Sequence, residues 1–158
     1  HLLMCRGCAF GGWGLGVGGW GLSCLILDLG SAVDNQKTVR ATCHCSAVEL
    51  ELTLPNGLEK LRRCNCSMCR RRNAVVASVT LENLKIIKGA GALKTYTFNT
   101  HAAKHYFCSN CGIYTHHQRR SEPSEYGFNI ACVEGVKIED YAATPYLDGR
   151  DHHPKDVP

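Results

Sequence analysis

Three groups of closely spaced cysteines are the residues in this sequence best suited to chemistry. Seven of the eleven cysteines fall into these groups: Cys43 and Cys45; Cys64, Cys66 and Cys69; and Cys108 and Cys111. Cysteines two or three positions apart rarely form a disulfide with each other, because their Cα separation and Cβ directions fit poorly. The same spacings let thiolates converge on one metal ion. The pattern therefore predicts metal binding, and thiols kept as ligands favour a reducing, cytoplasmic location.

The first and last groups predict a closed metal site. In the C-H-C motif at 43–45, side chains two positions apart in an extended segment point the same way. In the F-C-S-N-C-G motif at 107–112, a tight turn aims both sulfurs at one point, and the glycine permits a left-handed backbone. Four thiolates complete a tetrahedral shell, whereas the alternative is a set of buried free thiols. We therefore expect a structural zinc site formed by the quartet, Cys43, Cys45, Cys108 and Cys111.

The central motif, R-R-C-N-C-S-M-C-R-R-R at 62–72, supplies three sulfurs rather than four. We call its cysteines, Cys64, Cys66 and Cys69, the trio. Catalytic zinc commonly has three protein ligands and leaves the fourth position to water or substrate. We therefore expect an accessible catalytic zinc here, and two Zn²⁺ ions per chain. The alternative is that a fourth protein ligand closes the shell, and the candidates are Cys132, His44, His101 and His105.

Short strands with little helix are predicted to position these motifs. Residues 48–54 alternate apolar and polar side chains, which is the period of a strand with one buried face, and the turn sequence P-N-G follows. A single turn is expected in L-E-N-L-K after Thr80, and no stretch has a sustained helical period. The fold class is therefore mainly β, knit by zinc sites. Further strands are expected at 74–80, 84–89, 93–98 and 104–107, and in the segments G-I-Y-T-H-H and Y-G-F-N-I-A-C-V.

Composition divides the chain into three parts. Residues 1–36 are glycine-rich and include 21 consecutive uncharged residues at 7–27. Eight of those residues are glycine, which weakens a helix, so we expect a poorly ordered or adventitious extension rather than a membrane span or a secretory signal. Residues 37–150 are expected to form the zinc-binding domain, and 151–158 a polar tail. The turn-rich segment 146–154 could fold over the site or fray.

The net charge argues against nucleic acid as a partner. The formal charge of +4 counts every cysteine as neutral. If seven thiolates held two Zn²⁺ ions, the protein would carry only about +1. A nearly neutral surface is poorly suited to binding phosphates, and the aromatic residues fit a β core better than a stacking platform.

The cysteine motifs, taken in order, resemble those of the glutathione-dependent formaldehyde-activating enzyme family, which includes centromere protein V. The resemblance rests on C-H-C at 43–45, C-x-C-S-x-C-R-R at 64–71 and F-C-x-x-C-G at 107–112, and it covers roughly residues 38–150. It implies a mainly β, Mss4-like zinc fold, with the quartet as the structural site and the trio as the accessible site. It also implies formation of S-(hydroxymethyl)glutathione from formaldehyde and glutathione, which is a carbon–sulfur lyase reaction in reverse.

For such a reaction, a thiol would enter the open position at the trio and attack the carbon of formaldehyde or a related small aldehyde. Arg70 and Arg71, together with Arg72, are candidates to bind the carboxylates of a glutathione-like thiol, because a guanidinium pairs with a carboxylate bidentately. The developing alkoxide needs a proton or a positive neighbour, and His44 and His105 are possible carriers. The alternative function is a non-enzymatic, zinc-knit binding or scaffold module of the centromere protein V type.

Overall fold

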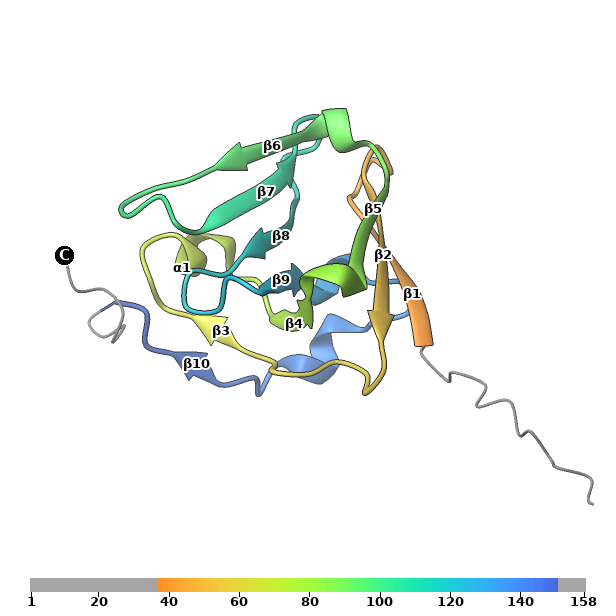
Figure 1. The fold of residues 1–158 in the computed structure, drawn as a ribbon. Helices are drawn as coiled ribbons and strands as arrows, with labels where there is room; N and C mark the ends of the chain where they lie inside the picture. The colour runs from red at the N-terminus through yellow and green to blue at the C-terminus, as the bar shows by residue number, and fades with distance from the viewer. Residues whose placement is uncertain (1–36, 151–158) are drawn as a thin grey trace, which may run out of the picture. The chain divides into compact units, whose positions relative to one another are not determined.

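The computed structural model describes residues 37–150 of the chain, and these residues form antiparallel sheets with little helix (Figure 1). One sheet has three strands in the order β1-β2-β5, and a second has five strands in the order β4-β9-β8-β7-β6. A short parallel pair, β3 with β10, lies outside both. The prediction of a mainly β fold is confirmed. The predicted extension 1–36 and tail 151–158 lie outside the described residues.

The elements follow one another closely along the chain. The strands are β1 (Lys37–Thr42), β2 (Glu49–Leu54), β3 (Arg63–Cys64), β4 (Val76–Thr80), β5 (Leu84–Lys88), β6 (Leu93–Tyr96), β7 (Lys104–Cys108), β8 (Tyr114–Gln118), β9 (Glu125–Asn129) and β10 (Tyr146–Leu147). The helical elements are the single-turn helix α1 (Cys69–Arg72) and the 3-10 turns η1 (Leu81–Asn83), η2 (Ala90–Ala92), η3 (Ile130–Cys132) and η4 (Ile138–Tyr141).

Strand β2 has the alternation that the sequence predicted. Its leucines, Leu50, Leu52 and Leu54, are buried, and the intervening residues are partly exposed. Glu49 on the outer face accepts a hydrogen bond from Lys88 of β5 at 2.9 Å. The period-2 pattern therefore reports which face of the three-stranded sheet packs inward.

The hydrophobic core draws side chains from both sheets. Phe128 of β9 and Ile130 of η3 are fully buried, and they belong to the same cluster as Leu50 and Leu52 of β2. A shared core of this kind holds the two sheets in a fixed relation, which the metal-ligating loops at their ends require.

The structure also contains elements that the sequence did not predict. Two of them, β3 and β10, are two residues long, and α1 is four residues long, so none carries a periodic pattern. The single turn predicted after Thr80 is present as η1, a 3-10 turn without a side-chain cap from Thr80. Among residues 37–150, no helix has the length and apolar character needed to cross a bilayer.

Gly89 is a position where the fold requires glycine. It lies in the left-handed region with φ of +77°, between β5 and η2, and an added Cβ would overlap the carbonyl oxygen of Ala47. Gly91 is a natural control, because an added Cβ there would meet no atom within 4 Å.

We predict that Gly89→Ala lowers the free energy of unfolding by about 2 kcal/mol or more, because backbone strain and overlap act together. Gly91→Ala should change it by no more than about 0.5 kcal/mol. Urea denaturation of the two variants measures the difference. Equal stabilities would mean that the β5–η2 connection tolerates a side chain and that this turn geometry is wrong.

Candidate functional site

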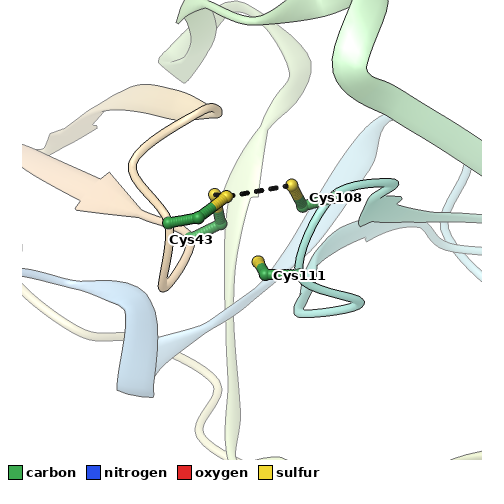
Figure 2. A group of neighbouring side chains, drawn as sticks. Cys43, Cys108 and Cys111 are labelled. Carbon is green, nitrogen blue, oxygen red and sulfur yellow. Dashed lines mark hydrogen bonds between the residues drawn. The ribbon is translucent and has the colours of Figure 1, made fainter.

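The four quartet sulfurs lie together, although they come from loops far apart in the sequence. Cys43 follows β1, whereas Cys108 ends β7 and Cys111 lies in the turn that follows, and the side chains point toward one another (Figure 2). All four sulfurs lie within 4.8 Å of one another, and the Sγ of Cys45 is 3.7 Å from those of Cys43 and Cys108. Four soft donors at these separations could hold one metal ion.

The quartet joins the two main sheets. Its first pair lies in the connection between β1 and β2 of the three-stranded sheet. In its second pair, Cys108 ends β7 of the five-stranded sheet, and Cys111 lies in the turn before β8. Backbone N–H groups support the sulfurs: Val48 donates to the Sγ of Cys43 at 3.3 Å. The pKa of Cys111 is lowered to about 6 by the N–H groups of Ile113 and Cys45. These N–H groups therefore favour a thiolate at Cys111, whereas the pKa of Cys45 is raised to about 11, because desolvation and the neighbouring thiols outweigh its backbone hydrogen bond.

The trio forms a second group on one short segment. Cys64 ends β3 and Cys69 begins α1, with Cys66 in the turn between them, and the three sulfurs lie within 4.8 Å of one another. The backbone N–H of Cys66 donates to the Sγ of Cys64 at 3.4 Å, and that of Cys69 donates to the Sγ of Cys66 at 3.3 Å. The main chain of the turn therefore holds the sulfurs of Cys64 and Cys66 in place.

The trio thiols compete for a single negative charge. The pKa of Cys66 is lowered because the thiols of Cys64 and Cys69 donate to its sulfur. The pKa of Cys69 is raised because its thiol bonds to Cys64 and Cys66, and that of Cys64 is raised by its bond to Cys66. A divalent cation would remove this conflict, since it stabilises all three thiolates at once. The donor set therefore fits a soft or borderline metal ion such as zinc.

Within the described residues, no further Cys, His, Asp or Glu joins the trio. Cys132, one candidate for a fourth ligand, is buried elsewhere, and its thiol contacts the carbonyl oxygen of Tyr114 at 3.7 Å. Burial and the nearby Cys43 and Cys111 raise the pKa of Cys132 to about 12, so it keeps its proton. All eight cysteines of residues 37–150 are free thiols.

The trio opens onto a cavity of about 530 Å³. All three of its cysteines line this cavity, and its other walls come from distant segments. These include Phe98, His105, Tyr114, His117 and Arg119 from the five-stranded sheet and its loops, Arg62 and Arg72 beside the trio, and Leu147, Asp148, Gly149 and Arg150 from the C-terminal segment.

The cavity wall carries an excess of guanidinium groups. Arg119 is paired with Glu125, which Lys60 also contacts. Neither Arg62 nor Arg72 forms an ion pair with a carboxylate among residues 37–150. The Nη2 of Arg62 is buried without a hydrogen-bond partner. A cavity with these groups favours an anionic ligand.

Two histidines in the wall are held neutral. His105 of β7 and His117 of β8 are cross-strand partners, and their rings stack with centroids 5.4 Å apart. Burial, and then the charge of Arg72, lowers the pKa of His105 to about 4. The pKa of His117 lies well below its usual value, chiefly because of burial. Tyr114 is hydrogen-bonded to His117, and its pKa is raised by burial, so the phenol keeps its proton.

The arginines after the trio occupy different environments. Arg70 and Arg71 are exposed, and neither is among the cavity-lining residues, whereas Arg72 lines the cavity and lies 4.2 Å above the ring of Tyr114. The Nη1 of Arg72 also lies 3.0 Å from the Nδ1 of His105.

The two candidate proton carriers, His44 and His105, also differ in their position relative to the cavity. His44 is exposed and does not line the cavity, whereas His105 is buried in its wall. Sequence reasoning did not single out Tyr114, His117 or Arg119. The only signal for them was the run of aromatic, histidine and arginine side chains in Y-T-H-H-Q-R at 114–119.

We predict that His105 stays neutral down to about pH 5 in the folded protein, whereas the same ring in the unfolded chain titrates near 6.5. Because the folded pKa is the lower one, the unfolded state binds this proton first as the pH falls. The burial of His105 therefore contributes stability above about pH 6.5, and this contribution is lost between pH 6.5 and 4. Nuclear magnetic resonance titration of the imidazole, with the urea-unfolded chain as control, measures both values. A folded midpoint near 6.5 would contradict the account.

Comparisons with known proteins agree with this architecture. Residues 38–146 match the family model described as glutathione-dependent formaldehyde-activating enzyme. A crystal structure of a Rhodobacter sphaeroides protein, a structural genomics target, is similar over 68% of this chain and 99% of that chain. The two sequences are 53% identical, and the TM-score is 0.66. The family match covers most of the chain, including both cysteine groups, so this protein belongs to the glutathione-dependent formaldehyde-activating enzyme family.

Proposed function

We propose that this protein adds a thiol, glutathione or a close relative, to formaldehyde or a related small aldehyde, in a reaction of the carbon–sulfur lyase type. The observation that supports this proposal most strongly is the trio, whose three sulfurs line a cavity large enough for a small peptide thiol. Family membership supports the same reaction.

The metal proposed for both cysteine groups is Zn²⁺, two ions per chain. The quartet would hold a structural ion, because four thiolates leave no exchangeable position. The trio would hold the catalytic ion, which when bound supplies a positive charge that keeps a substrate sulfur as thiolate. The free state of all eight described cysteines is consistent with a reducing, cytoplasmic setting.

The arginines of the cavity are proposed to bind the carboxylates of the thiol substrate. Arg72 is the stronger candidate among the three after the trio, because it lines the cavity and has no acidic partner within residues 37–150. Arg62 is the second, because it also lines the cavity and has no acidic partner within these residues. For Arg70 and Arg71, substrate binding stays a prediction. A guanidinium can pair with a carboxylate through two parallel hydrogen bonds, which would orient the thiol as well as bind it.

Neutral side chains would supply the hydrogen bonds that the reacting oxygen needs. Since Arg72 can only donate, the Nδ1 of neutral His105 accepts its hydrogen bond, and the ring proton sits on Nε2. This N–H is available to donate to the aldehyde oxygen as negative charge develops there. The nearby phenol of Tyr114 also holds its proton. The aromatic ring of Phe98 stacks on His105, with centroids 5.6 Å apart, and helps to exclude water from this side of the cavity.

The enzymatic proposal is favoured over the scaffold alternative by the position of the trio. A scaffold would work equally well with a closed four-ligand shell away from any cavity. Here the three sulfurs line a cavity of about 530 Å³, next to the guanidinium groups of Arg62 and Arg72, which have no carboxylate partner among residues 37–150.

We expect the purified protein to contain two zinc ions per chain. Cys66→Ser should retain one ion, because only the trio loses a donor. Cys108→Ser should lower both the zinc content and the free energy of unfolding, because the quartet joins two sheets. Cys132→Ser is the matched control, since this thiol belongs to neither group, and it should keep both ions. Elemental analysis with thermal unfolding measures both effects. A full zinc content in Cys66→Ser would count against the trio as a metal site.

We also expect the zinc-loaded protein to accelerate the reversible reaction in which glutathione and formaldehyde form S-(hydroxymethyl)glutathione. Cys66→Ser should lower this acceleration at least tenfold or so, since even substitutions of outer partners of metal ligands cost about 10–100-fold. Exchange spectroscopy at equilibrium measures the rate, with Cys132→Ser as the control that retains it. Equal exchange with and without protein would favour the scaffold alternative.

A further inference from the structure

The segment 145–150, which we call the strap, runs alongside the trio. Its strand β10 pairs in parallel with β3, which carries the first trio cysteine (Figure 1). The backbone N–H of Arg63 donates to the carbonyl oxygen of Pro145 at 2.9 Å, and that of Asn65 donates to the carbonyl oxygen of Leu147 at 3.2 Å. Sequence reasoning left open whether this part of the chain folds over the site or frays, and the structure folds it against β3.

One side chain fastens the strap beyond these backbone contacts. The Nδ2 of Asn65 donates to the Oδ1 of Asp148 at 3.0 Å, and the Oδ1 of Asn65 accepts from the backbone N–H of Gly149 at 2.7 Å. Asn65 stands between Cys64 and Cys66, so the turn that presents two trio sulfurs also holds the strap.

The backbone of the strap at Gly149 lies so close to Cys64 and Cys66 that a side chain there would overlap them. A Cβ added to Gly149 would lie 2.5 Å from the Sγ of Cys64 and 3.2 Å from the Cβ of Cys66. The φ of Gly149 lies outside the left-handed region, so the requirement at this position is for space rather than for backbone freedom. The strap also contributes a wall of the cavity onto which the trio opens.

We propose that the strap is a fixed wall of the trio site, and that Asn65 and Gly149 are the residues that position it. The wall closes the approach to Cys64 and Cys66 from the strap side, so that a ligand reaches the trio only through the cavity. Selectivity for the thiol then depends on two features: the distance of the strap from the sulfurs, and the arginine and aromatic groups that line the same cavity. The proposal rests on the proposed function, because it takes the trio to hold a zinc ion.

The test is the rate at which a chromogenic chelator, 4-(2-pyridylazo)resorcinol, removes zinc from the full-length, zinc-loaded protein. Asn65→Ala removes both side-chain bonds to the strap, so the strap opens more often, and release of the trio ion should accelerate roughly tenfold. Release of the quartet ion should not change. Ser67→Ala is the control, because Ser67 lies in the same turn, and the side-chain hydrogen bonds to the strap come from Asn65 instead. The same trio release rate in Asn65→Ala and in the wild type would overturn the proposal.

A second variant tests the closeness of the wall. Gly149→Ala should displace the strap and accelerate release of the trio ion in the same way, whereas Gly91→Ala, in open space, should leave it unchanged. Hydrogen exchange provides a readout independent of metal. The backbone amides of residues 65 and 149 should be less protected in both strap variants than in the wild type.

The two proposals fail in different ways. A wild-type chain that binds a single zinc ion would contradict the proposed function. The position of the strap would then be tested by hydrogen exchange alone. Unchanged protection of the two amides in both variants would overturn the strap, even if the exchange of glutathione with formaldehyde is accelerated as proposed.

Discussion

Mutual repulsion among clustered thiolates is the constraint on which the rest of this structure depends. Seven sulfurs gather in two groups, each within 4.8 Å, and such groups cannot ionise fully on their own. The opposed pKa shifts of Cys66 and Cys69 express this conflict within the trio. A bound cation would turn the conflict into a stabilising interaction, so metal binding and folding would be coupled. The sheets and loops bring the sulfurs together at the two places where such a cation could bind.

The two groups solve the same electrostatic problem with different consequences. The quartet takes its sulfurs from connections in both main sheets, and it therefore ties the fold together. The trio takes its sulfurs from a single turn, which leaves one side facing a cavity. Around that cavity, Arg62 and Arg72 lack carboxylate partners among residues 37–150, while burial keeps His105 and His117 neutral. Positive and neutral groups next to an open ligand position suit an anionic thiol and a small carbonyl compound.

Local patterns in the sequence predicted part of this arrangement. The alternation in residues 48–54 reported the buried face of β2, because side-chain direction in a strand depends only on position parity. The spacing within each cysteine motif predicted which sulfurs could meet. Both the alternation and the cysteine spacing depend on residues close together in the sequence, so they can be interpreted without knowledge of the fold.

The features that sequence did not predict depend on longer-range geometry. The environments of Arg70, Arg71 and Arg72 differ because α1 turns successive residues by about 100°, and a four-residue helix has no periodic pattern in the sequence. The pairing of His105 with His117 depends on the register of β7 and β8. The strap depends on hydrogen bonds between Asn65 and residues more than 80 positions away in the sequence. Its strand β10 has only two residues, which is too short for a periodic pattern that could predict it.

The central claim is that the trio holds an ion with one position open to a thiol. Zinc X-ray absorption spectroscopy of the zinc-loaded protein tests it most directly, by counting sulfur ligands with and without glutathione. The account predicts that the average number of sulfur neighbours per zinc rises when glutathione is added, and that S-methylglutathione, which lacks a free thiol, has no such effect. A sulfur count that glutathione leaves unchanged, with each ion already bound by four protein side chains, would contradict it.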